Sequence, residues 1–297
     1  MLIFSGNSNI PLAKKIASEL NLELGQLEII TFPDNENRVR VVDRVLDQDV
    51  VVVQSTGVSP NLYYMELFFI LDSLKRSGAR SVTLVVPYLG YQRQDHIFRD
   101  GEAVSLYVII KIIESLGVNR IISLDFHSIK IPQLFKIQVT HLSGLGSFAE
   151  KIKGIDKENL CLVSPDMGGI ARVEKLSDLC GGIPTTSIVK NRDLDTGDIE
   201  SVTVNGDVKK KAVIVDDVIS TGKTLIAAAK LLEEKGVAEI WVMATHGIFA
   251  NTASADLQNS NIKKVIITDT INIPDKRKFK KLEIVSIADL IAEEIRK

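Results

Sequence analysis

Apolar and polar positions follow two rhythms along the chain, one typical of strands and one typical of helices. Short runs of β-branched, apolar residues alternate with longer segments in which apolar residues recur at helical spacing. These rhythms predict strands over 49–54, 81–86, 211–215 and 239–244, and helices over 62–76 and 223–235. Strands that alternate with helices in this way are typical of βαβ units on a parallel sheet covered on both faces. We therefore predict an α/β fold.

The length of the chain and the repetition of this pattern indicate two domains. A chain of 297 residues is long for a single core and sufficient for two. The order strand, helix, strand occurs in both halves, which we interpret as structural relatives. A glycine-bearing stretch over 141–154 lies between them and is predicted to be the linker. We place the domains at 1–143 and 144–297; the last predicted helix, over 287–296, is counted with the second but could pack on either.

The composition and net charge of the chain argue against nucleic acid and membranes as partners. With 45% apolar and 25% charged residues, the chain has the make-up of a globular protein and not of a disordered one. A net charge of −2 gives no general attraction to nucleic acid or to anionic membranes. No apolar run approaches the length of a membrane span, and the first residues lack the features of a signal peptide. Two cysteines, Cys161 and Cys180, form no disulfide framework or metal motif. We expect a cytoplasmic protein.

The segment 211–224 has the residue types of a sugar-phosphate site. An apolar strand leads into Asp216 and Asp217, and a small, hydroxyl-rich turn then opens a helix. Backbone N–H groups over 220–224, the threonine hydroxyls and the positive helix end can bind a phosphate without a net basic charge. A carboxylate at the strand end can accept hydrogen bonds from vicinal hydroxyls of a sugar. The segment therefore predicts a site for a phosphorylated ribose.

Two other interpretations of this segment fail, and one stays open. A P-loop would need a glycine where Asp217 stands. A glycosidase pair is excluded because adjacent side chains on a strand point to opposite faces and cannot flank one bond. A capped strand-to-helix turn without any ligand remains an alternative for Asp216 and Asp217 considered alone.

The full run from Asp216 to Thr224 resembles the phosphoribosyl diphosphate signature of the phosphoribosyltransferase superfamily. The resemblance implies two phosphoribosyltransferase-like domains, each a mainly parallel sheet flanked by helices. It also implies that Asp216 and Asp217 hold the ribose. The residues that would surround the 5-phosphate are Ser220, Thr221, Gly222, Lys223 and Thr224. Lys223 stands where the superfamily frequently has glycine.

Five further segments resemble the two-domain branch of this superfamily, the ribose-phosphate pyrophosphokinases. The segment 32–36 is similar to the branch's Phe-Pro-Asp-Gly-Glu loop, which implies contacts with the ATP of a neighbouring active site; its polar residues are Asp34, Asn35 and Glu36. Asn35 replaces the glycine but tolerates a left-handed backbone. In the segment 88–96, which resembles the aromatic and Arg-Gln-Asp loop, the resemblance implies that Arg93 and Gln94 contact ATP. Guanidinium and carboxamide groups suit phosphate and base edges.

Two more of these segments carry metal ligands in the family. The segment 125–128 resembles the family's Asp-Leu-His, which implies that His127 ligates Mg²⁺ within a site otherwise made of phosphate and water oxygens. The segment 163–172 resembles Val-Ser-Pro-Asp-x-Gly-Gly, which implies that Asp166 binds metal and ribose. Some relatives have additional carboxylates for a further cation, but here Lys136 and Thr140 occupy the corresponding places. Without the resemblance, a lone histidine and a strand-end turn are more often structural.

The fifth segment, Lys190-Asn191-Arg192, resembles the family's catalytic Lys-x-Arg and precedes a polar stretch over 193–200 that looks like a mobile flap. The resemblance implies that Lys190 and Arg192 stabilise the transition state and that Arg192 also contacts ribose 5-phosphate. Read without it, two cations in a polar loop are an ordinary solvated feature.

Taken together, the resemblance implies Mg²⁺-dependent transfer of the β,γ-diphosphoryl group of ATP to ribose 5-phosphate, with AMP as the leaving group. A loop that reaches a neighbouring active site further implies a homo-oligomer, a dimer or hexamer. A phosphoribosyltransferase would use the same sugar-phosphate turn, but the motifs of the first half argue against it. A non-catalytic regulatory relative should lack the metal ligands or the flap cations, whereas this sequence retains all four residues.

Overall fold

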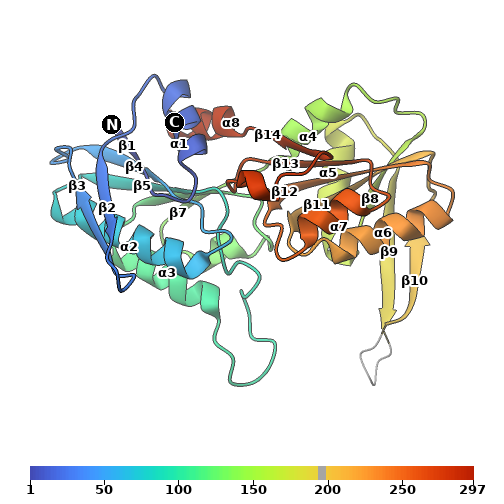
Figure 1. Cartoon of the computed structure of the whole chain (residues 1–297), viewed down its shortest axis with the longest axis horizontal. Helices are drawn as coiled ribbons and strands as arrows, with labels where there is room; N and C mark the ends of the chain where they lie inside the picture. The colour runs from blue at the N-terminus through green and yellow to red at the C-terminus, as the bar shows by residue number, and fades with distance from the viewer. Residues whose placement is uncertain (193–198) are drawn as a thin grey trace. The chain divides into compact units, whose positions relative to one another are not determined.

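The computed structural model describes residues 1–192 and 199–297, and the side chains of 190–192 and 199–202 lie outside that description. It contains two compact units, coloured from the N-terminus to the C-terminus in Figure 1. The first unit comprises Met1–Ser143, Thr270–Asn272 and Ser286–Lys297. The second unit comprises Gly144–Asp269 and Ile273–Val285.

The first unit is built on a five-stranded sheet in the order β1-β4-β5-β6-β7. All of its neighbouring strands run parallel. The strands are β1 (Leu2–Ser5), β4 (Asp49–Val53), β5 (Ser81–Val86), β6 (Arg120–Leu124) and β7 (Gln138–Leu142). A separate antiparallel hairpin consists of β2 (Leu27–Thr31) and β3 (Asn37–Val41). The helices are α1 (Ile10–Glu19), α2 (Pro60–Arg76), α3 (Ser105–Ser115) and α8 (Ala288–Ile295), with a short 3₁₀ turn over Ile131–Leu134.

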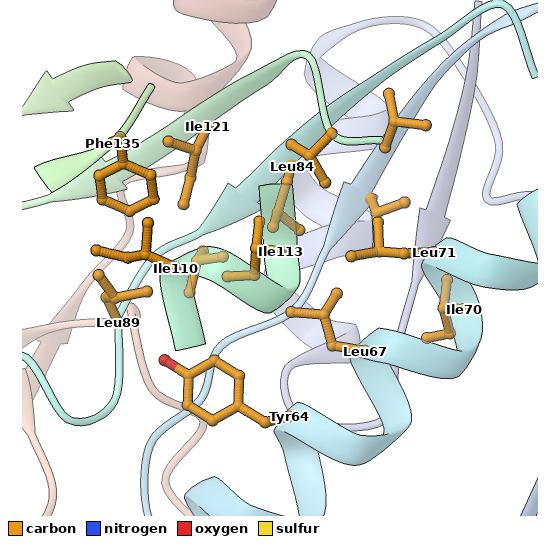
Figure 2. Packing of buried hydrophobic residues seen from close by; sticks show 14 of the residues in the cluster. Tyr64, Leu67, Ile70, Leu71, Leu84, Leu89, Ile110, Ile113, Ile121 and Phe135 are labelled. Carbon is orange, nitrogen blue, oxygen red and sulfur yellow. The ribbon is translucent and has the colours of Figure 1, made fainter. Parts of the chain in front are cut away.

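Helices cover both faces of this sheet, which explains why its strands read as continuous apolar runs. Along β4, Val50 and Val52 belong to the core beneath α2 and α3. Val51 and Val53, which point the other way, belong to the core shared with α1 and α8. Figure 2 shows the first of these cores, in which Tyr64 and its neighbours on α2 face residues of β5 and α3. The sheet is therefore a central layer between two helical layers.

The C-terminal helix belongs to the first unit, which corrects its assignment from the sequence to a domain over 144–297. Ile287 and Ile291 are fully buried in the same core as Ile16 of α1, and α1 and α8 lie side by side in Figure 1. An ion pair between Arg120 of β6 and Glu294 of α8 also ties this helix to the sheet of the first unit. The spacing of apolar residues along α8 predicts that one face of the helix is buried, but it does not indicate which domain that face packs against.

The second unit is built on a seven-stranded sheet in the order β10-β9-β8-β11-β12-β13-β14. Only β9 and β10 pair antiparallel among its described strands. The strands are β8 (Leu160–Ser164), β9 (Thr185–Arg192), β10 (Ile199–Asn205), β11 (Lys211–Ile219), β12 (Glu239–Gly247), β13 (Lys264–Thr268) and β14 (Leu282–Val285). The helices are α4 (Leu145–Ile152), α5 (Ile170–Leu179), α6 (Lys223–Glu234) and α7 (Ala253–Asn259), with short 3₁₀ turns over Met167–Gly169 and Asp275–Arg277.

The stretch over 141–154 contains the division between the two units, which falls after Ser143, but most of it is regular structure and not a linker. β7 extends to Leu142, and α4 begins at Leu145. Phe148 and Ile152 of α4 are fully buried in the core of the second unit. Glycines near the start of a short helix produced the appearance of a loop. The predicted α/β class is confirmed, and no helix within the described residues is long and apolar enough to cross a lipid bilayer.

Candidate active site

In the second unit, the predicted sugar-phosphate segment lies at the carboxyl end of the central strand β11. Asp216 and Asp217 are part of that strand, which pairs with β12 as far as Ile219. The turn that follows is tied down where the carbonyl oxygen of Ser220 accepts the N–H of Ala250 at 2.9 Å. This is the edge at which open parallel sheets bind their ligands.

Gly222 shapes the turn and begins α6. Its backbone is left-handed, with φ of +74°, and its carbonyl oxygen accepts the first helical hydrogen bond, from Ile226. A β-carbon here would approach the side chain of Leu257 to 3.3 Å, and the positive φ would strain any other residue. The first N–H groups of α6, from Lys223 onward, have no acceptors within the helix and suit an anion. The turn therefore opens directly onto the N-terminus of α6, and its role as a phosphate site stays a prediction from the sequence.

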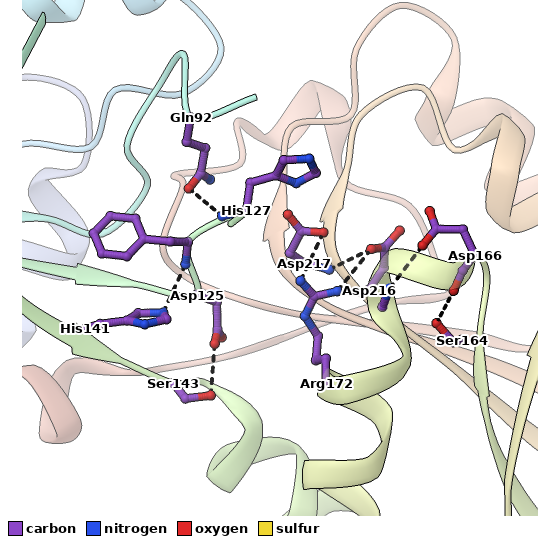
Figure 3. Close-up of polar contacts among 12 residues, drawn as sticks. Gln92, Asp125, His127, His141, Ser143, Ser164, Asp166, Arg172, Asp216 and Asp217 are labelled. Carbon is purple, nitrogen blue, oxygen red and sulfur yellow. Dashed lines mark hydrogen bonds and ion pairs between the residues drawn. The ribbon is translucent and has the colours of Figure 1, made fainter. Parts of the chain in front are cut away.

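One guanidinium faces both carboxylates of β11. Arg172 on α5 places Nη1 3.4 Å from Oδ1 of Asp216 and Nη2 3.4 Å from Oδ1 of Asp217 (Figure 3). All three side chains are largely buried. Burial, and secondly the neighbouring charge of Asp217, raise the pKa of Asp216 to about 8, while Arg172 opposes the shift. Asp216 also accepts the N–H of Asp217 at 2.8 Å.

Sequence reasoning missed the role of Arg172, although a signal for it was present. Two adjacent acidic residues at a buried strand end need a compensating charge. Arg172 is the single cation within the matched segment 163–172.

Asp166 follows β8, the strand next to β11. Its carboxylate accepts the N–H of Gly169 at 3.1 Å, and the hydroxyl of Ser164 donates to its carbonyl oxygen at 2.7 Å. A β-carbon on Gly169 would come within 2.6 Å of that hydroxyl and would displace it from its hydrogen bond to Asp166. Asp166 is exposed, which leaves its carboxylate accessible to a ligand.

In the first unit, the segment around His127 follows β6. Asp125 adopts a left-handed backbone with φ of +33°, and the hydroxyl of Ser143 donates to its carboxylate at 2.9 Å. The N–H of Phe126 donates to Nε2 of His141 at 3.1 Å. The N–H of His127 donates to Oε1 of Gln92 at 3.0 Å, and its own side chain is exposed (Figure 3).

The loop that carries Arg93 and Gln94 follows β5. Gly90 approaches the chain so closely that a β-carbon would meet the carbonyl oxygen of Thr56 at 2.5 Å. The hydroxyl of Tyr64 donates to the carbonyl oxygen of Gly90 at 2.8 Å. Arg93 and Gln94 are exposed, and Oε1 of Gln94 already accepts a hydrogen bond from a serine at the start of α3. The loop is anchored at its base and leaves both predicted ATP contacts accessible.

The loop over 32–36 joins β2 to β3. Asn35 has φ of +69°, which confirms the left-handed backbone expected where the family has glycine. The carboxylate of Asp34 accepts the N–H of Glu36 at 3.2 Å, and all three residues are exposed.

Lys190 and Arg192 lie in β9 by their backbones, in register with Val202 and Ile199 of β10. Their side chains lie outside the description, as do residues 193–198 of the predicted flap. The catalytic role of the two cations stays a prediction from the resemblance.

Comparison with known proteins places these features in one family. Residues 1–117 match the N-terminal domain of ribose phosphate pyrophosphokinase, and residues 187–297 match the phosphoribosyl synthetase-associated domain. Ribose-phosphate pyrophosphokinases of Bacillus caldolyticus and Aquifex aeolicus are 35% and 41% identical, over 99% of this chain and 93% and 94% of theirs. The crystal structure of phosphoribosylpyrophosphate synthetase from Mycobacterium smegmatis superposes with a TM-score of 0.93 at 32% identity, covering 99% of this chain and 97% of that one.

The chain therefore belongs to the ribose-phosphate pyrophosphokinase family. The family and the enzyme class predicted from the motifs are both confirmed.

Proposed function

We propose that the chain catalyses the transfer of the β,γ-diphosphoryl group of ATP to the 1-hydroxyl of ribose 5-phosphate, with AMP and 5-phosphoribosyl 1-diphosphate as products. The observation that carries this proposal is the end of β11, where two carboxylates precede a left-handed glycine and the start of a helix. The full-length similarity to ribose-phosphate pyrophosphokinases supports it independently.

Ribose 5-phosphate binds, in this proposal, at the segment 216–224. The phosphate accepts hydrogen bonds from the N–H and hydroxyl groups between Ser220 and Thr224, at the positive end of α6. Asp216 accepts from the ribose hydroxyls, and Asp217, which is 4% exposed, holds Arg172 in place behind it. Phosphate and sugar are thus bound by different parts of one strand-to-helix connection.

ATP binds, in this proposal, through Arg93 and Gln94 of the first unit and through the exposed loop 34–36 of a neighbouring subunit. The exposure of these side chains supports a role in ligand contact, since neither loop needs them for its own core. This arrangement requires a homo-oligomer. Two free, buried thiols, Cys161 and Cys180, support a reducing compartment such as the cytoplasm.

Mg²⁺ is the cation we expect with ATP. No group of three or more His, Cys, Asp or Glu side chains within residues 1–192 and 199–297 could hold a metal by itself. This donor set fits a cation that arrives with ATP and keeps phosphate and water oxygens as its main ligands. His127 of the first unit and Asp166 of the second unit are the residues that we would expect as cation ligands, and each is exposed. When bound, Mg²⁺ neutralises charge on the transferring diphosphoryl group.

The side chains contribute by position and charge. The ribose 1-oxygen attacks the β-phosphorus of ATP in line and loses its proton to solvent, the bond from that phosphorus to the α,β-bridging oxygen breaks, and AMP leaves. Lys190 and Arg192 stabilise the negative charge that develops during this transfer. Asp216 fixes the sugar so that its 1-hydroxyl is presented for attack.

The experiment that tests this function follows AMP formation by the purified chain from ATP, ribose 5-phosphate and Mg²⁺, with and without inorganic phosphate and ADP. We expect AMP only when the sugar phosphate is present. A phosphoribosyltransferase would instead make a nucleotide from a base and 5-phosphoribosyl 1-diphosphate, and a non-catalytic relative would bind substrates without turnover. Either of these results would contradict the proposal.

A further inference from the structure

Two side chains, one from a loop and one from a strand, hold the backbone of the segment that presents His127. Gln92 comes from the loop after β5, and its Oε1 accepts the N–H of His127 at 3.0 Å. His141 comes from β7, and its Nε2 accepts the N–H of Phe126 at 3.1 Å. β5 and β7 are the two sheet neighbours of β6. Consecutive N–H groups beyond the end of β6 are therefore bound from both sides.

The buried side chain of Gln92 makes its hydrogen bond to His127 through its oxygen, whereas its nitrogen has no partner among the described residues. The residue is 1% exposed, and its Nε2 is buried without a hydrogen-bond partner in the part of the chain that the structure describes. An unpaired buried donor is unfavourable, so the side chain is not placed there for the sake of its nitrogen. Because the N–H of His127 can only donate, the oxygen of Gln92 must face it.

The backbone beside His127 needs such support. Asp125 adopts φ of +33°, which an L-amino acid rarely adopts and which persists only when its surroundings hold it. Its N–H donates to the carbonyl oxygen of Leu142 at 3.0 Å, and its carboxylate accepts from Ser143. The rings of Phe126 and His141 also contact each other, with centroids 4.8 Å apart.

We propose that Gln92 and His141 are positioning residues for His127, which fix the backbone from which its imidazole reaches the metal complex of ATP. This inference rests on the proposed function, in which His127 is a ligand of Mg²⁺. Groups that orient a metal ligand commonly change metal affinity ten- to a hundredfold when they are removed. We expect each positioning residue to act at about the lower end of that range.

The test replaces each acceptor by an apolar side chain of similar size, Gln92→Met and His141→Leu. The primary readout is the binding of Mn²⁺, as a paramagnetic substitute for Mg²⁺, in the presence of α,β-methylene ATP, measured by electron paramagnetic resonance. We expect affinity to fall roughly tenfold in each variant. Amide hydrogen exchange in the metal-free protein provides a second readout, and the amides of residues 126 and 127 should exchange faster.

Asn119→Leu is the matched control. Oδ1 of Asn119 also accepts a backbone N–H, that of Val82, at 2.8 Å, but at the opposite end of the same sheet. Asn119→Leu removes a hydrogen bond of the same type. We expect it to leave the Mn²⁺ affinity, and the amide exchange rates of residues 126 and 127, equal to those of the parent. His141→Gln, which retains an acceptor, should restore most of the affinity lost in His141→Leu. Because His141 is exposed, this pair remains informative if Gln92→Met fails to fold.

The variant His127→Ala separates the two levels of the argument. If it retains parental Mn²⁺ affinity, the proposed metal role of His127 is wrong. If it loses affinity while both Gln92→Met and His141→Leu bind Mn²⁺ like the parent, the metal role stands and the positioning inference is overturned.

Discussion

Asp216 should release its proton when ribose 5-phosphate binds. Burial and the charge of Asp217 raise the pKa of its carboxyl group to about 8, so most molecules of the free protein carry a neutral Asp216 at pH 7. The ribose hydroxyls donate most strongly to a charged carboxylate. Binding therefore selects the minor, ionised form.

The size of the effect follows from the pKa. One pH unit below a pKa of about 8, roughly a tenth of the groups are ionised, so the apparent affinity for ribose 5-phosphate is about tenfold lower at pH 7 than at pH 9. The phosphate group of the sugar does not contribute in this range, because its second pKa is about 6. Close to one proton should leave the protein for each sugar phosphate bound at pH 7. At pH 9 the number should fall to about a tenth of a proton.

Isothermal titration calorimetry in pairs of buffers with different ionisation heats measures this proton release directly. Asp216→Asn should abolish the release and flatten the pH dependence. Arg172→Met should raise the pKa of Asp216 further, because the guanidinium at 3.4 Å opposes the shift, and should weaken binding at pH 7. Parental protein that binds with no proton release, and with the same affinity at pH 7 and pH 9, would refute this reasoning.

The same carboxyl group affects folding. Its pKa is higher in the folded state than the ordinary value of 3.8, so the folded protein binds more protons between these values. Stability contributed by Asp216 is therefore present at low pH and decreases as the pH rises from about 4 to about 8, by at most ~1.4 kcal/mol per pH unit. Denaturant unfolding should show a flatter pH profile for Asp216→Asn than for the parent.

Three further substitutions address other parts of the molecule. Gly90→Ala places a β-carbon against the carbonyl oxygen of Thr56 and should raise the KM for ATP roughly ten- to a hundredfold. The KM for ribose 5-phosphate should stay unchanged, and equal shifts in both constants would contradict the role of this loop. Ile291→Ala, at a fully buried position of α8, should lower the unfolding free energy by about 2–5 kcal/mol in urea titrations. Lys190→Ala should reduce kcat about a thousandfold or more with an unchanged Tm, and activity within tenfold of the parent would remove Lys190 from catalysis.

Strands and helices with a strong local pattern were predictable to within a few residues. The helix predicted from residue 62 begins at Pro60, because proline is favoured in the first turn, where its missing N–H is not needed. The strand predicted to end at residue 215 continues to Ile219, because its backbone keeps pairing with β12 while Arg172 from another element faces the two carboxyl groups. Such compensation comes from another element and leaves no mark on the local pattern.

The same limit applies to the site. The sugar-phosphate segment was recognisable because all of its groups lie within one short run. The left-handed backbone of Asn35 was expected because the family has glycine there and asparagine tolerates the same conformation. Gln92 and His141 act on residues that lie 35 and 15 positions away in the chain. Contacts of this kind depend on which strands become neighbours, which a single sequence does not specify.

The measurement closest to the central claim is a ³¹P nuclear magnetic resonance time course of the purified chain with ATP, ribose 5-phosphate and Mg²⁺. Transfer of an intact diphosphoryl group produces AMP and a sugar 1-diphosphate in equal amounts, and this is the result we expect. Formation of ADP, which signals transfer of a single phosphoryl group, or a spectrum in which ATP is unchanged, would contradict the account.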